Sequence, residues 1–194
     1  MMKFLKDVMG EYSPEIKEWD EPTTRVFNGT EVEGRPTKGF GTASFKYAGK
    51  LYDPDPWTDD ILIIKWAAEE LVLTAFDKKV DFTFCLCGLY KTGEIAIPHH
   101  SDTVPTQKDY VFSVSYGDPR VFEWNEYAYY IKKRTNTSKI NILHGERYLK
   151  TTRYIVEEGD AFIFDGKSQM TSTHAVPPVF GAGKRINLTF RSGL

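Results

Sequence analysis

A succession of short apolar segments after residue 80 constrains the fold more than any other feature of the chain. The segments are FTFCLCGLY (82–90), YVFSVSYG (110–117), RVFEWN (120–125), EYAYYIKK (126–133), RYLKTTRYIV (147–156), AFIF (161–164) and RINLTFR (185–191). They are rich in β-branched or aromatic residues and are bounded by Gly, Asp and Pro, so we predict a β-strand for each. Many short strands at this spacing favour an antiparallel sandwich or a jelly roll.

One long amphipathic segment, PWTDDILIIKWAAEELVLTAF (56–76), predicts the clearest helix of the chain. Thr58 is suited to cap its N-terminus, and Asp59 and Asp60 suit the first turn. An apolar stripe follows at helical spacing and consists of Ile61, Ile64, Ala68 and Leu71. We expect this helix to support an outer face of the β core, which makes the fold mainly β within the α+β class.

Composition limits both the size and the location of the protein. The chain has 194 residues, 41% of them hydrophobic, which suits a single domain over residues 1–194. A net charge of −2 excludes a global basic field for nucleic acid, so any such contact must come from a local patch. Cys85 and Cys87 lie on one face of a predicted strand and are expected to be core thiols in a reducing compartment.

The N-terminus lacks the apolar region of a signal peptide, and no run approaches the length of a membrane span. We expect a soluble, intracellular monomer that does not bind membranes, and the sequence does not distinguish cytoplasm from nucleus.

The stretch PHHSD (98–102) raises the question of a metal site. If it forms a strand, His100 and Asp102 share a face and aim an imidazole and a carboxylate at one point. His174, in STHAVPP, is the best third ligand, while His99 and His144 are weaker candidates. Two His and one carboxylate leave open positions on iron(II), as an oxygenase requires. Taken alone, the pattern also fits an ordinary polar turn.

The segment RINLTFR alternates strictly between polar and apolar residues. Its polar face consists of Arg185, Asn187, Thr189 and Arg191, and its apolar face consists of Ile186, Leu188 and Phe190. One interpretation is an edge strand with a solvated charged face. The other is an anion site, because a guanidinium fork matches a carboxylate through two hydrogen bonds. The spacing does not decide between them.

The order H-x-D, a distal His, and then R-x-N-x-T-x-R resembles the AlkB family of iron(II) and 2-oxoglutarate dependent dioxygenases. The stretches LYKTGEIAIPHHSD, FSVSYGDPRVFEW and EGDAFIFDGKSQMTSTHAVPP resemble the family around these motifs. Upstream, GRPTKGFGTASFKYAG and PDPWTDDILIIKWAAEEL are similar to its substrate lid and supporting helix. The resemblance covers most of residues 24–192, and the hairpin-like segment around 125–155 is longer than usual.

The resemblance implies a double-stranded β-helix, a jelly-roll core at about residues 80–192 with an N-terminal lid at about 24–56. It implies three iron ligands, namely His100, Asp102 and His174. It also implies a 2-oxoglutarate pocket in which Arg185 and Tyr90 hold the distal carboxylate, completed by Asn187, Thr189 and Arg191. The implied reaction uses Fe(II), 2-oxoglutarate and O2 to demethylate or hydroxylate a modified nucleobase in DNA or RNA. The alternatives are hydroxylation of a protein side chain or small metabolite, and a binding module without turnover.

Two positions depart from the family pattern. Many members carry Asn two residues before the tyrosine, where this chain has Gly88, so another group or water must supply that hydrogen bond. Most repair members that act on cationic bases carry an acid where this chain has Val104, which predicts either a neutral modified base or a substrate that is not a nucleobase. For the substrate we predict stacking on Phe45 and Tyr47, and a phosphate contact from Arg35.

Overall fold

The computed structural model describes residues 2–4, 13–22, 24–27, 30–47, 50–102, 110–127, 131–134, 140–144, 148–165 and 168–192. Its helices are α1 (Asp59–Phe76) and α2 (Ser168–Thr171). Its strands are β1 (Met2–Phe4), β2 (Thr24–Phe27), β3 (Thr30–Glu33), β4 (Thr37–Gly41), β5 (Phe45–Tyr47), β6 (Lys50–Tyr52), β7 (Phe84–Tyr90), β8 (Ile97–His100), β9 (Tyr110–Gly117), β10 (Arg120–Tyr127), β11 (Ile131–Arg134), β12 (Ile140–His144), β13 (Tyr148–Val156), β14 (Ala161–Asp165), β15 (Ser172–Val176) and β16 (Arg185–Arg191).

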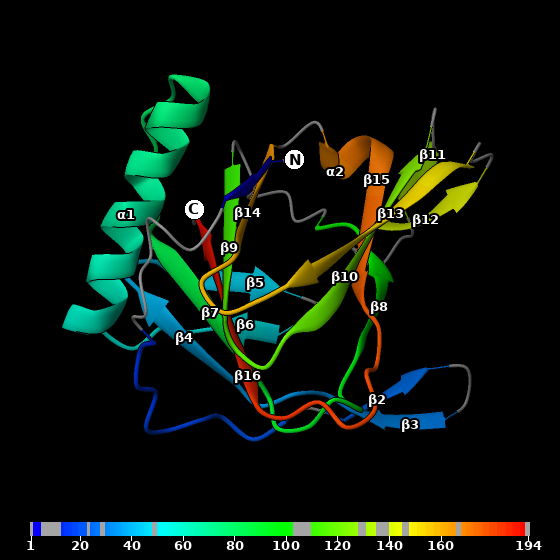
Figure 1. Cartoon of the computed structure of the whole chain (residues 1–194), viewed down its shortest axis with the longest axis horizontal. Coiled ribbons are helices and arrows are strands. Elements are labelled where there is room, and N and C mark those ends of the chain that lie inside the picture. The colour runs from blue at the N-terminus through cyan, green and yellow to red at the C-terminus, as the bar shows by residue number, and fades with distance from the viewer. Residues whose placement is uncertain are drawn as a thin grey trace.

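Two antiparallel sheets face each other (Figure 1). The larger has the strand order β1-β14-β9-β16-β7-β4, and the smaller has the order β13-β10-β15-β8. The neighbouring strands β10 and β15 are separated in sequence by β11 to β14, and β16 lies between β9 and β7, so the chain alternates between the sheets. This arrangement confirms the predicted jelly roll.

Helix α1 covers the outer face of the large sheet, as predicted (Figure 1). Thr58 caps it by accepting a hydrogen bond from the backbone N–H of Ile61 at 3.4 Å. The apolar stripe is buried against Phe112, Leu188 and Phe190 of the sheet. The helix ends at Phe76, and the C-cap residue Asp77 adopts a left-handed conformation with φ of 52°. Among the described residues no helix combines the length and the apolar character that a membrane crossing needs.

A second apolar cluster fills the space between the two sheets. The large sheet contributes Tyr90, Val111, Phe162 and Phe164, and the small sheet contributes Phe122, Trp124, Val156 and Val176. Because both faces of the large sheet are covered, its central strands β7 and β16 are buried along their whole length. Cys85 and Cys87 lie in β7 as buried free thiols with sulfur atoms 3.8 Å apart, which confirms the core assignment.

The position of strand β16, which is the segment RINLTFR, excludes one of the two interpretations of that segment. It lies in the middle of the large sheet and pairs with both β7 and β9, so it is not a solvated edge strand. The polar face predicted from alternation is therefore an interior surface. It points between the sheets, whereas Ile186, Leu188 and Phe190 pack on the α1 side.

The segment around 24–56 is divided among three sheets. Strands β2 and β3 form one hairpin and β5 and β6 form another, while β4 pairs with β7 at the edge of the large sheet. Part of the stretch that the sequence assigned to a lid therefore belongs to the core. The pairing of β11 with β12 likewise confirms a hairpin within the long 125–155 segment.

Candidate active site

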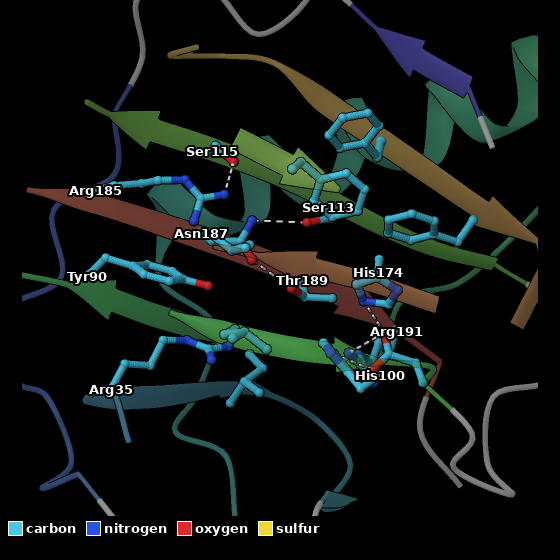
Figure 2. A pocket seen from close by; sticks show the side chains of 17 residues that line it. Arg35, Tyr90, His100, Ser113, Ser115, His174, Arg185, Asn187, Thr189 and Arg191 are labelled. Carbon is cyan, nitrogen blue, oxygen red and sulfur yellow. Dashed lines mark hydrogen bonds and ion pairs between the residues drawn. The ribbon is translucent and has the colours of Figure 1, made fainter. Parts of the chain in front are cut away.

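A pocket lies between the inner faces of the two sheets (Figure 2). It brings together every residue that the sequence analysis assigned to iron or to 2-oxoglutarate: Tyr90, His100, Asp102, His174, Arg185, Asn187, Thr189 and Arg191. Arg35 also lines it, as do Ser113 and Ser115. The polar residues come from strands of both sheets and from residues that flank those strands, so only the folded chain assembles them.

Three of these residues form a metal-ligating cluster. Strand β15 pairs with β8 so that His174 lies opposite His100, and Asp102 follows two residues after β8 ends. Nε2 of His100 lies 3.8 Å from Oδ1 of Asp102, and Nε2 of His174 lies 3.8 Å from Oδ2. Asp102 is thus outside the strand that the sequence predicted for it, but its carboxylate still reaches the predicted point.

The donor set fits a divalent metal ion. Bonds from such an ion to nitrogen or oxygen are about 2.1 Å, so two ligands of one ion lie within about 4.2 Å of each other. Both His–Asp separations of 3.8 Å satisfy this limit, and the whole set lies within 4.8 Å and needs only a slight closure. Two imidazoles and one carboxylate also suit iron(II) and leave positions for further ligands.

Neighbouring groups orient both imidazoles. Nδ1 of His100 lies 2.9 Å from the carbonyl oxygen of Pro98, which suits a donated hydrogen bond and leaves the Nε2 lone pair for a ligand bond. The His174 ring stacks against Phe122, Trp124 and Phe164, with ring centroids 5.6, 6.1 and 5.3 Å away. These contacts hold the two ligand nitrogens in place before any metal binds.

Electrostatics keep the cluster in the protonation state that a metal requires. Burial, with His100 beside it, lowers the pKa of His174 to about 3. Burial also lowers the pKa of His100, against the attraction of Asp102. Burial alone would raise the pKa of the Asp102 carboxyl, but Arg191 and the two imidazoles outweigh it and hold that pKa well below its ordinary value. Near neutral pH the set is therefore two neutral imidazoles and one carboxylate.

The inner face of β16 forms the floor of the pocket. Arg185 donates from Nη2 to Oγ of Ser115 at 2.6 Å, and Arg191 donates from Nη2 to Oδ2 of Asp102 at 3.1 Å. Between them, Asn187 donates to Oγ of Ser113 at 2.9 Å and accepts from Thr189 at 3.2 Å. Arg191 therefore belongs to the metal end of the strand, and Arg185 to the other end.

The end of the pocket at Arg185 is suited to an anion. Tyr90 lies opposite Arg185 in the β7–β16 pairing, and the guanidinium carbon is 4.7 Å from the centre of its ring. The Arg185 side chain is buried, and burial lowers its pKa, with Tyr90 acting in the opposite direction. An arginine remains charged in such a site. A buried guanidinium fork beside a phenol is a suitable recognition group for a carboxylate.

The residues predicted to contact the substrate differ in their location, and two of them lie partly or wholly outside the described structure. Phe45 is 1% exposed and stacks on Phe84, with the Arg191 guanidinium 5.2 Å from its ring, so a substrate reaches it only by displacing these neighbours. Tyr47 lies on β5, but its side chain is outside the described part of the structure, and so is the whole of Val104. Arg35 enters the pocket. Substrate contact by these residues stays a prediction.

The two weaker histidine candidates do not join the described cluster. Nε2 of His99 lies 3.1 Å from Oε2 of Glu123, and the other carboxylate oxygen, Oε1, accepts a hydrogen bond from Nε of Arg153 at 2.6 Å. His99 thus faces away from its neighbour His100, as expected for adjacent residues of a strand. His144 ends β12, and its side chain is not described.

Two kinds of residue in the pocket or beside its predicted ligand His174 were missed by the sequence analysis. Ser113 and Ser115 bind the β16 side chains, and they were detectable as the polar alternate positions of the otherwise apolar segment YVFSVSYG. The aromatic residues around His174 carried no such signal, because Phe122, Trp124 and Phe164 resemble ordinary core residues in their strands.

Comparisons with known proteins agree with this geometry. A family model described as the 2OG-Fe(II) oxygenase superfamily matches residues 5–191. The uncharacterized protein R406 of Acanthamoeba polyphaga mimivirus is 26% identical over 118 residues, which are 59% of this chain and 59% of that protein's length. The structure of OsALKBH1 superposes with a TM-score of 0.57 at 16% identity, covering 96% of this chain and 88% of the other.

Proposed function

The chain belongs to the 2OG-Fe(II) oxygenase superfamily, and from that premise we propose that it demethylates or hydroxylates a modified nucleobase in DNA or RNA. A member of this superfamily is a dioxygenase that uses Fe(II), 2-oxoglutarate and O2. In our proposal His100, Asp102 and His174 bind the iron. Arg185 and Tyr90 bind the distal carboxylate of 2-oxoglutarate, while Asn187, Thr189 and Arg191 complete the pocket.

The observation that carries the assignment is the arrangement of two different recognition sites in one pocket. A two-histidine, one-carboxylate cluster lies at one end, and a buried arginine beside Tyr90 lies at the other. 2-Oxoglutarate has complementary ends, a keto acid that chelates a metal and a distal carboxylate that suits a guanidinium. A cosubstrate of this shape would span the pocket.

With iron and 2-oxoglutarate bound, O2 oxidises the keto acid to succinate and CO2 and delivers its second oxygen atom to a substrate C–H bond. The chain's own residues supply position and charge. Asp102 and the imidazoles fix the metal, Arg191 holds Asp102 in place, and Arg185 fixes the far end of the cosubstrate. The stacked aromatic rings around His174 exclude water from that side of the site. An N-methyl group oxidised here becomes an N-hydroxymethyl group, which releases formaldehyde.

The nucleobase as substrate is supported by the AlkB-like sequence motifs and by the location of the β5–β6 hairpin. This hairpin begins at Phe45, whose ring lies against Arg191 at the metal end of the pocket. Tyr47 lies two residues further along β5, and in our proposal it contacts the substrate at this end of the pocket. A base that reaches the iron must leave its stack, and an aromatic residue on this hairpin would replace the lost stacking.

The test is mass spectrometry of oligonucleotides that carry cationic or neutral methylated bases, in single and double strands. They are incubated with the protein, Fe(II), 2-oxoglutarate and O2, and succinate is measured in the same samples. We expect one oligonucleotide to lose a methyl group or gain an oxygen atom, and Val104 leads us to expect a neutral base. Succinate without any altered oligonucleotide would overturn the nucleobase proposal and direct the search to proteins and metabolites.

Adjacent histidines provide a matched control for the metal assignment. His100→Ala should abolish succinate formation, whereas His99→Ala should retain it, because His99 faces Glu123 on the outer side. Normal turnover by His100→Ala would exclude this residue as a ligand.

A further inference from the structure

The glycine at position 88 opens a space in the pocket that the side chain of Arg35 occupies. We propose that Arg35 is a second guanidinium for the distal carboxylate of 2-oxoglutarate, and that Gly88 is required because only glycine admits it. The inference rests on the proposed function and assigns Arg35 to the cosubstrate instead of to a substrate phosphate.

The backbone fixes Arg35 beside β7. Arg35 precedes β4, and the β4–β7 pairing places Thr37 opposite Gly88. The backbone N–H of Leu89 donates to the carbonyl oxygen of Pro36 at 2.9 Å, which extends this pairing to the residue after Arg35. The same register places Arg35 opposite Tyr90, the neighbour of Gly88 on this face of β7, so strand pairing holds the Arg35 side chain beside Gly88.

The space at Gly88 is filled by the arginine side chain. A Cβ atom at position 88 would lie 2.1 Å from Nε of Arg35, 2.9 Å from Cδ and 3.0 Å from Cζ. The backbone does not require glycine, since the positive-φ glycines of the described chain are Gly117, Gly159 and Gly181. Glycine weakens a strand interior, so its presence in buried β7 has a steric reason. Any larger residue would push the guanidinium aside.

The Arg35 guanidinium reaches the same end of the pocket as Arg185. Figure 2 shows Tyr90 between the two arginines, away from His100 and His174. The guanidinium carbons lie 5.2 Å (Arg35) and 4.7 Å (Arg185) from the centre of the Tyr90 ring. Two forks on either side of one phenol can together surround both oxygens of a carboxylate.

This end of the pocket contains positive charge without a matching carboxylate among the described lining residues. Asp102 is the one carboxylate among them, and it pairs with Arg191 at 3.1 Å. Nε of Arg35 and Nε of Arg185 are buried and make no hydrogen bond within the described part of the chain. A carboxylate bound beside Tyr90 would neutralise positive charge that the described lining residues leave unbalanced at this end.

The test measures equilibrium binding and does not require turnover. The full chain is loaded with Mn(II) in the absence of O2, and 2-oxoglutarate binding is followed by isothermal titration calorimetry. Arg35→Gln should raise the Kd for 2-oxoglutarate about 10- to 100-fold, as expected for loss of a charged hydrogen bond. Arg35→Lys should give a smaller loss, because an ammonium keeps the charge but lacks the fork. The Mn(II) affinity should not change.

A second ligand tests which end of the cosubstrate is recognised. 2-Oxopentanoate has the same keto acid but ends in a methyl group, so Arg35→Gln should bind it as the unchanged protein does. An equal loss for both acids would show that Arg35 does not act on the distal carboxylate and would overturn the inference.

A double-mutant cycle tests the role of Gly88. Gly88→Ala should weaken 2-oxoglutarate binding about as much as Arg35→Gln, because the new Cβ displaces the guanidinium. In the Arg35→Gln background the same Gly88→Ala change should cost little further affinity, since nothing cationic is left to displace. Fully additive losses would assign Gly88 a separate structural role and overturn the pairing of the two residues.

The outcomes also separate this inference from the proposed function. Normal 2-oxoglutarate binding by correctly folded Arg35→Gln and Arg35→Lys would overturn the inference and leave the dioxygenase assignment intact. Failure of the unchanged Mn(II)-loaded protein to bind 2-oxoglutarate would overturn the proposed use of this pocket, and the inference with it.

Discussion

The two ends of the pocket contain similar cations in opposite electrostatic surroundings. At the metal end, Arg191 is paired with the buried carboxylate of Asp102. At the Tyr90 end, Arg185 and Arg35 lie on either side of the phenol ring, with guanidinium carbons 4.7 and 5.2 Å from its centre (Figure 2). At the metal end the chain itself balances the charge of Arg191, whereas at the Tyr90 end our proposal assigns that role to the carboxylate of a bound cosubstrate. The charge of an arginine alone therefore does not reveal its role in the pocket, because that role depends on whether the chain supplies a carboxylate partner.

The largest effect is expected from breaking the charge balance at the metal end. Asp102→Ala should abolish metal binding and succinate formation, because one ligand of three is lost. It should also lower the free energy of unfolding by about 3–5 kcal/mol, since Arg191 is left as a buried cation without this carboxylate. Metal titration and urea denaturation measure the two effects separately.

The double variant Asp102→Ala with Arg191→Met provides the control. It removes both charges, so most of the lost stability should return while metal binding remains absent. If stability does not return, the pair is not the cause of the destabilisation.

An intermediate effect is expected from the opposite end. Arg185→Gln should raise the Kd for 2-oxoglutarate about 100-fold, because a buried guanidinium opposite a carboxylate is lost, and should leave Mn(II) affinity unchanged. Lys184→Gln removes a neighbouring but exposed cation and serves as the control, with an expected change below about twofold. Loss of metal affinity in Arg185→Gln would show that the two ends are not independent.

The last effect builds up gradually and is expected from pH, which acts on the imidazoles and not on the arginines. The pKa of His174 is lowered to about 3 in the folded state, whereas the unfolded chain takes up this proton near 6.5. As pH falls from 6.5 toward 3, only the unfolded state gains the proton. The metal-free protein should therefore lose stability over that range, at up to about 1.4 kcal/mol per pH unit from this group.

Urea denaturation of chelator-treated protein at several pH values measures this slope. The His174→Ala variant should show a slope that is smaller by the contribution of one proton. An identical slope in the variant would show that His174 is not the group responsible.

Local patterns predicted much of the site. Strict alternation in RINLTFR identified which side chains share a face, and the H-x-D spacing with His174 identified the metal cluster that the folded chain brings together. The capped helix α1 was predicted from Thr58 and the apolar stripe, because helix caps and helical periodicity are also local signals.

Features that depend on distant strand pairing were not predictable. Nothing in RINLTFR says that it lies between β7 and β9, so its polar face suited either solvent or an interior pocket. The inward direction of Arg35 depends on the register of β4 against β7, which brings Gly88 beside it. The position of Asp102 beyond the end of β8 could also not be foreseen, since the sequence does not show where that strand ends.

Because both faces of β16 are buried, one polar and one apolar, its side chains strongly specify the register of this central strand. A slip of one residue against its neighbours would turn the two arginines toward the apolar cluster under α1 and would place Leu188 and Phe190 in the pocket. Such a chain would be both misfolded and inactive. The polar groups of β16 therefore destabilise a wrong strand pairing as well as forming the pocket. A molecule that binds its cosubstrate must have this central strand in the correct register.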